Sequence, residues 1–133
     1  MNVLVVEPLK EPYAKEIDPG LESLQHEVNG YIECLGLDED ACIICNEEGK
    51  INGLELNRAI RDEKGKIADI IAGTFLVVGS SEEDFDSLTP QQTEKYKRQF
   101  RYPETFMRFG REIVAIPIKP RMENKKHRSE PER

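Results

Sequence analysis

The sequence predicts an α+β fold in a single domain: a mixed, largely antiparallel sheet with two or three short helices. Three observations predict it. Short apolar segments rich in β-branched residues recur along the 133 residues and favour strands. Turn residues separate most of these segments at hairpin-like distances, and helix-capping signals occur at only a few places. Strands with interspersed helices and short links are typical of α+β domains.

The length and charge of the chain limit its organisation and partners. We expect one domain at residues 1–119 and a charged, disordered tail at residues 120–133, where Met122 is the only large apolar residue. The formal charge of the whole chain is −7, and the tail carries five basic and three acidic residues, so residues 1–119 hold −9. Such a charge repels nucleic-acid phosphates and argues against direct nucleic-acid binding.

The distribution of apolar residues predicts the compartment. No apolar run approaches the about 20 residues that a membrane helix needs. The first residues lack the basic and apolar regions of a secretory signal. We therefore expect a cytoplasmic protein that does not contact a membrane.

The first half of the chain is expected to form four strands and one helix. The strands are expected at residues 2–7, 13–17, 31–35 and 41–45, with an acidic loop at 38–40. Asp18 caps the expected helix and Pro19 occupies its first turn. Leu21, Leu24 and Val28 follow at helical spacing. Gly30, after Asn29, accepts the left-handed conformation that ends the helix.

Two similar turn signals follow, at residues 46–51 and 62–67. Each has an Asx residue three positions before a glycine, which favours a hairpin with a type I turn closed by a left-handed glycine. Between them, Leu54, Leu56 and Ile60 fit either a short helix or an irregular crossover. The apolar segments on either side of Gly73 fit one long bent strand or two paired strands.

The last third of the domain contains two capping boxes and an aromatic segment. Residues 80–83 have the capping-box form and predict a brief helical turn that ends near Leu88. Residues 89–92 form a second capping box and predict a helix to about Phe100, with Tyr96 facing the core. The final elements are an aromatic lid made by Tyr102, Phe106, Met107 and Phe109, and a strand at residues 112–117.

Few residue patterns in the chain carry chemistry. The CxxC spacing of Cys42 and Cys45 lies in an apolar strand, where an offset of three places the two thiols on opposite faces, so we expect core cysteines and no metal site. No phosphate-binding loop or catalytic motif occurs. His26, on the expected helix, has no partner that the sequence identifies. We therefore expect no cofactor and lean against an enzyme.

One polar pair, Asn57-Arg58, lies among apolar residues and is the candidate binding site. In the structural interpretation, Asn57 pins the backbone, and Arg58 extends its charge to solvent or pairs with a carboxylate. In the functional interpretation, Arg58 offers a forked donor to a carboxylate or phosphate, with Tyr31 beside it across the sheet. A concave pocket lined by this pair would favour the functional interpretation.

Several segments in a fixed order carry a resemblance to a known family. They are Leu21–Gln25, Gly30–Glu33, Cys45–Lys50, Asn57-Arg58 and Gly73–Gly79. Together they resemble a small bacterial domain of unknown function found on phages, plasmids and conjugative elements. The resemblance covers roughly residues 1–118. It implies a mobile-element accessory protein and transfers no catalytic residue.

Three functions are compatible with these observations. The first is a non-enzymatic mobile-element accessory protein that binds a host protein or a small molecule. The second is a nucleotide or anion binder, or a small enzyme, that uses Arg58 and Asn57. The third is an acidic nucleic-acid mimic that inhibits a DNA-binding host enzyme. The third requires the acidic clusters at residues 38–40 and 82–86 to lie on one surface.

Overall fold

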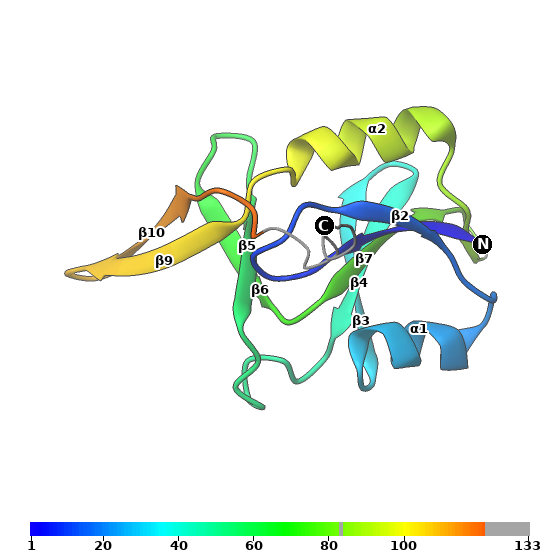
Figure 1. The fold of residues 1–133 in the computed structure, drawn as a ribbon, viewed down its shortest axis with the longest axis horizontal. Coiled ribbons are helices and arrows are strands. Elements are labelled where there is room, and N and C mark those ends of the chain that lie inside the picture. The colour runs from blue at the N-terminus through cyan, green and yellow to red at the C-terminus, as the bar shows by residue number, and fades with distance from the viewer. Residues whose placement is uncertain (83, 122–133) are drawn as a thin grey trace, which may run out of the picture.

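The computed structural model describes residues 1–82 and 84–121, and its centre is an antiparallel sheet (Figure 1). The strands of this sheet are β1 (Asn2–Val6), β2 (Tyr13–Glu16), β3 (Ile32–Asp38), β4 (Ala41–Asn46), β7 (Phe75–Ser80) and β8 (Phe85–Asp86). Their order is β2-β1-β7-β4-β3, with β8 beside β7. Two further strand pairs, β5 (Leu56–Arg61) with β6 (Ile67–Ala72) and β9 (Glu104–Phe109) with β10 (Glu112–Pro117), form separate hairpins.

The predicted α+β class is confirmed, with antiparallel sheets and two helices, α1 (Leu21–Val28) and α2 (Pro90–Gln99). Every strand pairing in the described residues is antiparallel, so the expected mixed sheet is not found there. Neither helix in the described ranges combines the length and the apolar character needed to cross a membrane. The expected tail lies outside the described residues from residue 122 onward.

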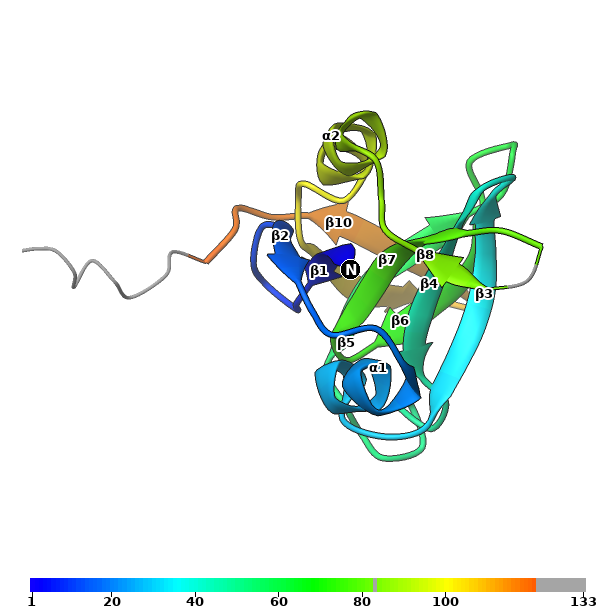
Figure 2. The ribbon, with the colours of Figure 1, turned by 90° about the vertical axis from the view of Figure 1, so that its right-hand side faces the viewer.

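The central strands are buried on both faces because one helix covers each face (Figure 2). Leu24 and Val28 of α1 pack with Val3 and Val5 of β1 on one face. The other face packs against Tyr96 of α2 and the residues around it. Such double coverage explains why β4 and β7 are almost continuously apolar rather than alternating.

The ends of α1 differ from the prediction. Gly20, with φ of +118°, takes the N-cap position and no side chain caps the helix, so the expected Asp18 cap is wrong. Asn29, not Gly30, adopts the left-handed conformation, with φ of +63°. Gly30 is required for a different reason: a Cβ there would lie 2.6 Å from Nδ2 of Asn46. Of the three apolar residues at helical spacing, Leu24 and Val28 are buried, whereas Leu21 is 57% exposed.

The two turn signals have different outcomes. The hairpin at residues 62–66 is confirmed, because the Asp62 N–H donates to the Lys66 carbonyl at 2.8 Å and Gly65 has φ of +82°. The hairpin expected at 46–51 is wrong. Asn46 Oδ1 accepts from the Glu48 N–H and makes a local turn, but the chain then leaves the sheet for β5, which is a strand rather than a helix or an irregular crossover.

Gly73 separates two strands that belong to different sheets. Its φ of +86° bends the chain between β6 and β7, which are not paired with each other. Of the two expected alternatives, one long bent strand is therefore closer to the structure than two paired strands. The helical turn expected after residue 80 is wrong, because β7 continues to Ser80 and β8 follows at Phe85. The second capping box is confirmed: Thr89 Oγ1 accepts from the Gln92 N–H, and Gln92 Oε1 accepts from the Thr89 N–H.

Candidate functional site

The side chain of Asn57 lies in the second position of β5, where it joins three segments of the fold. It is 1% exposed. Its Nδ2 donates to the carbonyls of Val6 at 2.9 Å and Gly73 at 2.8 Å, and its Oδ1 accepts from Arg58 Nη1 at 2.8 Å. Asn57 therefore fixes the end of β1 and the bend at Gly73 to β5, and its amide is fully satisfied.

Arg58 is also 1% exposed, and its guanidinium makes five hydrogen bonds. Nε and Nη2 donate to the Phe100 carbonyl at 3.1 and 2.8 Å. Nη2 also donates to the Lys10 carbonyl at 2.7 Å, and Nη1 donates to the Glu7 carbonyl at 3.4 Å and to Asn57 Oδ1. The five bonds match the five N–H groups of the side chain. Burial lowers the pKa of Arg58 to about 10, partly offset by the charge of Glu104.

The geometry of this pair favours its structural interpretation. The donors of Arg58 are already used by backbone carbonyls and by Asn57, so a ligand would have to break bonds within the fold. Arg58 neither extends its charge to solvent nor bonds a carboxylate among the described residues. Tyr31 is 71% exposed, precedes β3 and makes no side-chain hydrogen bond to Asn57 or Arg58 in the described chain. The structure therefore joins Asn57 to Arg58 but not to Tyr31.

A cavity of about 260 Å³ lies beside Arg58, between the end of α2, strand β5 and the base of the β9–β10 hairpin. Its lining residues are Arg58, Ala59, Arg61, Gln99, Phe100, Tyr102, Glu104 and Pro117. Glu104 is 9% exposed, and its two oxygens accept from the Ala59 N–H at 2.8 Å and from Arg61 Nη2 at 3.0 Å. We call this the junction cavity. Sequence reasoning missed Arg61 and Glu104, although an acidic residue among aromatic ones was a usable signal.

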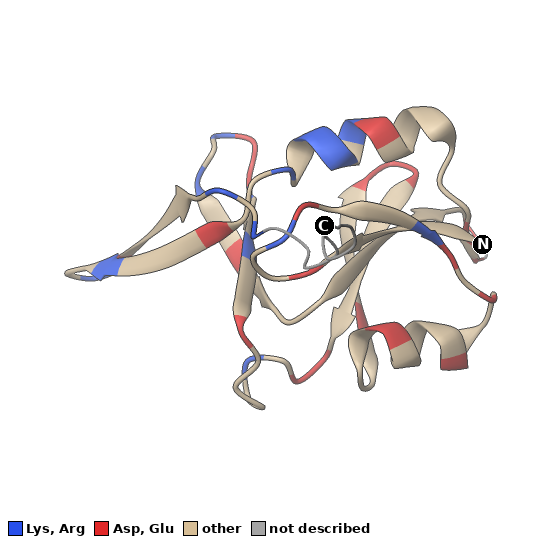
Figure 3. Cartoon of the chain, in the orientation of Figure 1, with Lys and Arg blue, Asp and Glu red and all other residues tan. Residues whose placement is uncertain are grey.

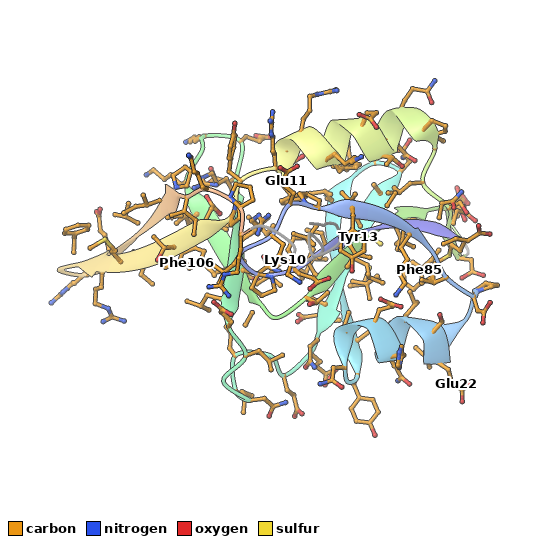
Figure 4. The ribbon with its side chains drawn as sticks, viewed as in Figure 1. Lys10, Glu11, Tyr13, Glu22, Phe85 and Phe106 are labelled. Atoms are coloured by element: carbon orange, nitrogen blue, oxygen red, sulfur yellow. The ribbon has the colours of Figure 1, made fainter. Side chains whose placement is uncertain are left out.

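The β9–β10 hairpin extends away from the rest of the fold, and it replaces the predicted aromatic lid (Figures 1 and 4). Its strands are joined at Gly110, which has φ of +62°. Met107, Phe109, Ile113 and Val114 are each between 37% and 58% exposed. Met107 and Val114 are cross-strand partners, as are Phe109 and Glu112. Side chains alternate between faces along a strand, so Met107, Phe109 and Val114 share one face of the hairpin and Ile113 lies on the other. All four are exposed to solvent and do not cover the core.

Two acidic segments meet at another cavity, of about 440 Å³, whose lining includes Asp38, Glu82 and Asp84. The Ser80 N–H donates to the Asp40 carbonyl at 2.9 Å and holds the segments together. Asp38 also accepts from Lys95 Nζ at 2.6 Å, which links the acidic loop to α2. Figure 3 shows that α2 carries both basic and acidic positions. The hydrogen bond from Lys95, with others from the Glu39 backbone and Tyr96, lowers the pKa of Asp38 to about 2.

The cysteines lie where the strand pattern placed them. Cys42 packs on the α1 face of the sheet and Cys45 on the α2 face, which confirms the prediction of opposite faces. Burial raises the pKa of Cys42 to about 12 and that of Cys45 to about 11. Cys34 on the neighbouring strand β3 also raises the pKa of Cys42, and sequence spacing did not indicate that pair. Within the described ranges, no three His, Cys, Asp or Glu side chains are grouped as metal ligands.

Comparison with known protein families gives a match over most of the chain. A family model described as a domain of unknown function (DUF3846) matches residues 1–101. No curated protein and no solved structure matches the chain. The matched residues contain the central sheet, both helices and the Asn57-Arg58 pair, and they end before β9 begins. The chain therefore belongs to the DUF3846 family.

Proposed function

We propose that this protein is a non-enzymatic accessory protein of a phage, plasmid or conjugative element, and that it binds a host protein through the β9–β10 hairpin. One observation carries the proposal: one face of the hairpin exposes Met107, Phe109 and Val114 to solvent. A two-stranded hairpin is marginally stable alone in water. Contiguous exposed apolar surface commonly marks an interaction site.

The charge distribution supports this assignment of roles. Residues 1–101 contain 11 basic and 21 acidic residues, a formal charge of −10, whereas residues 102–119 contain three basic and two acidic residues. The hairpin is thus close to neutral beside a strongly acidic body. A host protein with an apolar groove and a basic rim would fit both the hairpin and the acidic body. The opposite charges accelerate the encounter of the two proteins, and contact between apolar surfaces supplies the affinity.

The direct test is capture of a partner by matched variants. Met107→Ser combined with Val114→Ser removes apolar surface from one face of the hairpin. Ile51→Ser is the control, because Ile51 is 83% exposed and lies outside the hairpin. We expect the wild-type chain and the control to capture the same host protein and the hairpin variant to lose it.

Two outcomes would overturn the proposal. In one, all three chains capture the same proteins to the same extent. In the other, the purified wild-type chain self-associates and the hairpin variant does not, because a second copy then covers the surface that we assign to a host protein. Analytical ultracentrifugation over a range of protein concentrations distinguishes the second outcome.

A second candidate function is supported by the acidic cavity. The clusters at 38–40 and 82–86 approach each other there, as mimicry of nucleic acid requires, although Lys95 neutralises part of the charge. Glu82→Gln with Asp84→Asn should then weaken inhibition of a DNA-binding host enzyme. Glu22→Gln with Glu63→Gln, which removes the same charge elsewhere, should not. Equal inhibition by both double variants would exclude mimicry by this surface.

A further inference from the structure

The junction cavity combines an excess of positive charge with an apolar surface, and neither has a role in the proposed docking of the hairpin. Two arginines line it, Arg58 and Arg61, together with one carboxylate, that of Glu104. The local formal charge is therefore positive on a body that is otherwise strongly acidic. Buried charges in proteins are normally paired, so an unbalanced arginine beside a cavity indicates a site for an anion.

Arg58 supplies charge to this cavity but no hydrogen bond. Its five bonds go to carbonyl oxygens and an amide oxygen, none of which carries a full negative charge. Glu104 is the carboxylate that acts on Arg58, and it already bonds Arg61 at 3.0 Å. The single carboxylate of Glu104 is thus the counter-charge for the guanidinium groups of both Arg58 and Arg61.

Hydrogen-bond donors for an anion remain on Arg61 and Gln99. The bond from Arg61 to Glu104 uses Nη2, and the side chain of Arg61 is 40% exposed. In the described part of the chain, Nε and Nη1 of Arg61 and the amide of Gln99 have no protein acceptor. A guanidinium and an amide at one cavity wall suit the oxygens of a phosphate group.

An apolar surface continues from the same cavity. Tyr102, which is 53% exposed, and Pro117 line both the junction cavity and a second, open hollow of about 410 Å³ that also includes Ile118 and Lys119. The guanidinium of Arg101 lies 5.3 Å from the centre of the Tyr102 ring and holds this side chain in place. A planar ring attached to the phosphate would pack on the Tyr102–Pro117 surface.

We propose that the junction cavity binds a nucleoside monophosphate, with its phosphate on Arg61 and Gln99 and its base on Tyr102 and Pro117. The volume of about 260 Å³, extended by the open hollow, matches a ligand of this size. The body charge of −10 in residues 1–101 disfavours a polynucleotide. The residues of the hairpin assigned to a host protein, Met107, Phe109 and Val114, do not line this cavity, although Glu104 and Pro117 at the base of the hairpin do.

Calorimetric titration with AMP, adenosine and inorganic phosphate tests the proposal. The wild-type chain is expected to bind AMP at one site, and adenosine or phosphate alone at least about tenfold more weakly, since each makes only part of the contacts. Arg61→Gln should weaken AMP binding at least about tenfold. Arg108→Gln, the same change at an exposed position on the hairpin, should bind as the wild type does.

A second variant keeps the test decisive if loss of the Arg61–Glu104 ion pair unfolds the chain. Tyr102→Ala changes an exposed side chain and should weaken AMP binding while leaving phosphate binding unchanged. Absence of saturable AMP binding to the wild-type chain, or equal binding by wild type, Arg61→Gln and Tyr102→Ala, would overturn the proposal. So would equal affinity for AMP and inorganic phosphate. None of these results affects capture of a host protein by the hairpin.

Discussion

The junction at Asn57-Arg58 and the β9–β10 hairpin differ in their contacts: the polar side chains of the junction have hydrogen-bond partners, whereas the apolar side chains of the hairpin are exposed to solvent. At the junction, two buried polar side chains make hydrogen bonds with backbone carbonyls from distant segments. On the hairpin, apolar side chains are 37% to 58% exposed and pack against little. The polar pair that the sequence suggests as a binding site thus makes its hydrogen bonds within the fold. The exposed apolar surface of the hairpin is the one that we propose for a partner.

The largest expected effect is at Arg58. Arg58→Met removes the guanidinium donors to the carbonyls of Lys10 and Phe100 and leaves the Glu7 carbonyl only its bond from the Lys10 N–H. Each buried acceptor left unpaired costs about 1–3 kcal/mol. We expect the free energy of unfolding, measured by urea denaturation, to fall by at least about 3 kcal/mol. Arg58→Lys should not restore it, because an ammonium group cannot reproduce the forked geometry. A loss below about 1 kcal/mol would show that the junction is not structural.

A smaller loss is expected at Asn57. Asn57→Ala removes the amide donor to the carbonyls of Val6 and Gly73, and we expect about 1–3 kcal/mol of destabilisation in the same measurement. Asn52→Ala, in the exposed turn before β5, is the matched control and should change stability by less than about 0.5 kcal/mol. Equal effects of the two substitutions would contradict the role assigned to Asn57.

The ion pair that joins the acidic loop to α2 predicts a pH dependence. The pKa of Asp38 is lowered from 3.8 to about 2, chiefly by the hydrogen bond from Lys95. Because the folded-state pKa is the lower one, the stabilisation is present above pH 4 and is lost as the pH falls toward 2. An NMR titration of the Asp38 carboxyl group should have its midpoint near 2. In Lys95→Met the midpoint should move toward 3.8, and an unchanged midpoint would show that Lys95 is not the cause.

The smallest effect on stability is expected on the hairpin. Met107→Ser with Val114→Ser alters side chains that are 47% and 37% exposed, so the free energy of unfolding should change by no more than about 0.5 kcal/mol per substitution. The same urea measurement provides the check. A loss of several kcal/mol would mean that the hairpin is part of the core, and the contrast with Arg58 would disappear.

Local patterns predicted some elements correctly because their partners are close in sequence. The capping box of Thr89 and Gln92 and the turn from Asp62 to Lys66 depend on neighbours within four residues. The capping-box pattern at residue 80 failed because a distant contact competes with it: the Ser80 N–H bonds the Asp40 carbonyl and extends β7. Tertiary pairing thus overrides a local helix signal.

The candidate site was predictable only in part. The apolar neighbours of Asn57-Arg58 drew attention to the pair, and both side chains are buried. Its acceptor Val6 is 51 positions away, and Arg58 reaches Phe100 across 42 positions, so no local spacing indicates either bond. Tyr31 was associated with the pair through an assumed strand neighbour that the sheet order does not contain. The exposure of Met107 and Phe109 was missed because an aromatic segment normally predicts a core.

The central claim is that the hairpin, and not the polar junction, is the surface that meets a partner. Amide hydrogen exchange of the chain with and without its captured host protein tests it most directly. We predict slower exchange in peptides from residues 104–117 on binding, with exchange in β5 around Asn57 and Arg58 unchanged. Protection confined to other surfaces, with hairpin amides exchanging at the same rate in both states, would contradict the claim.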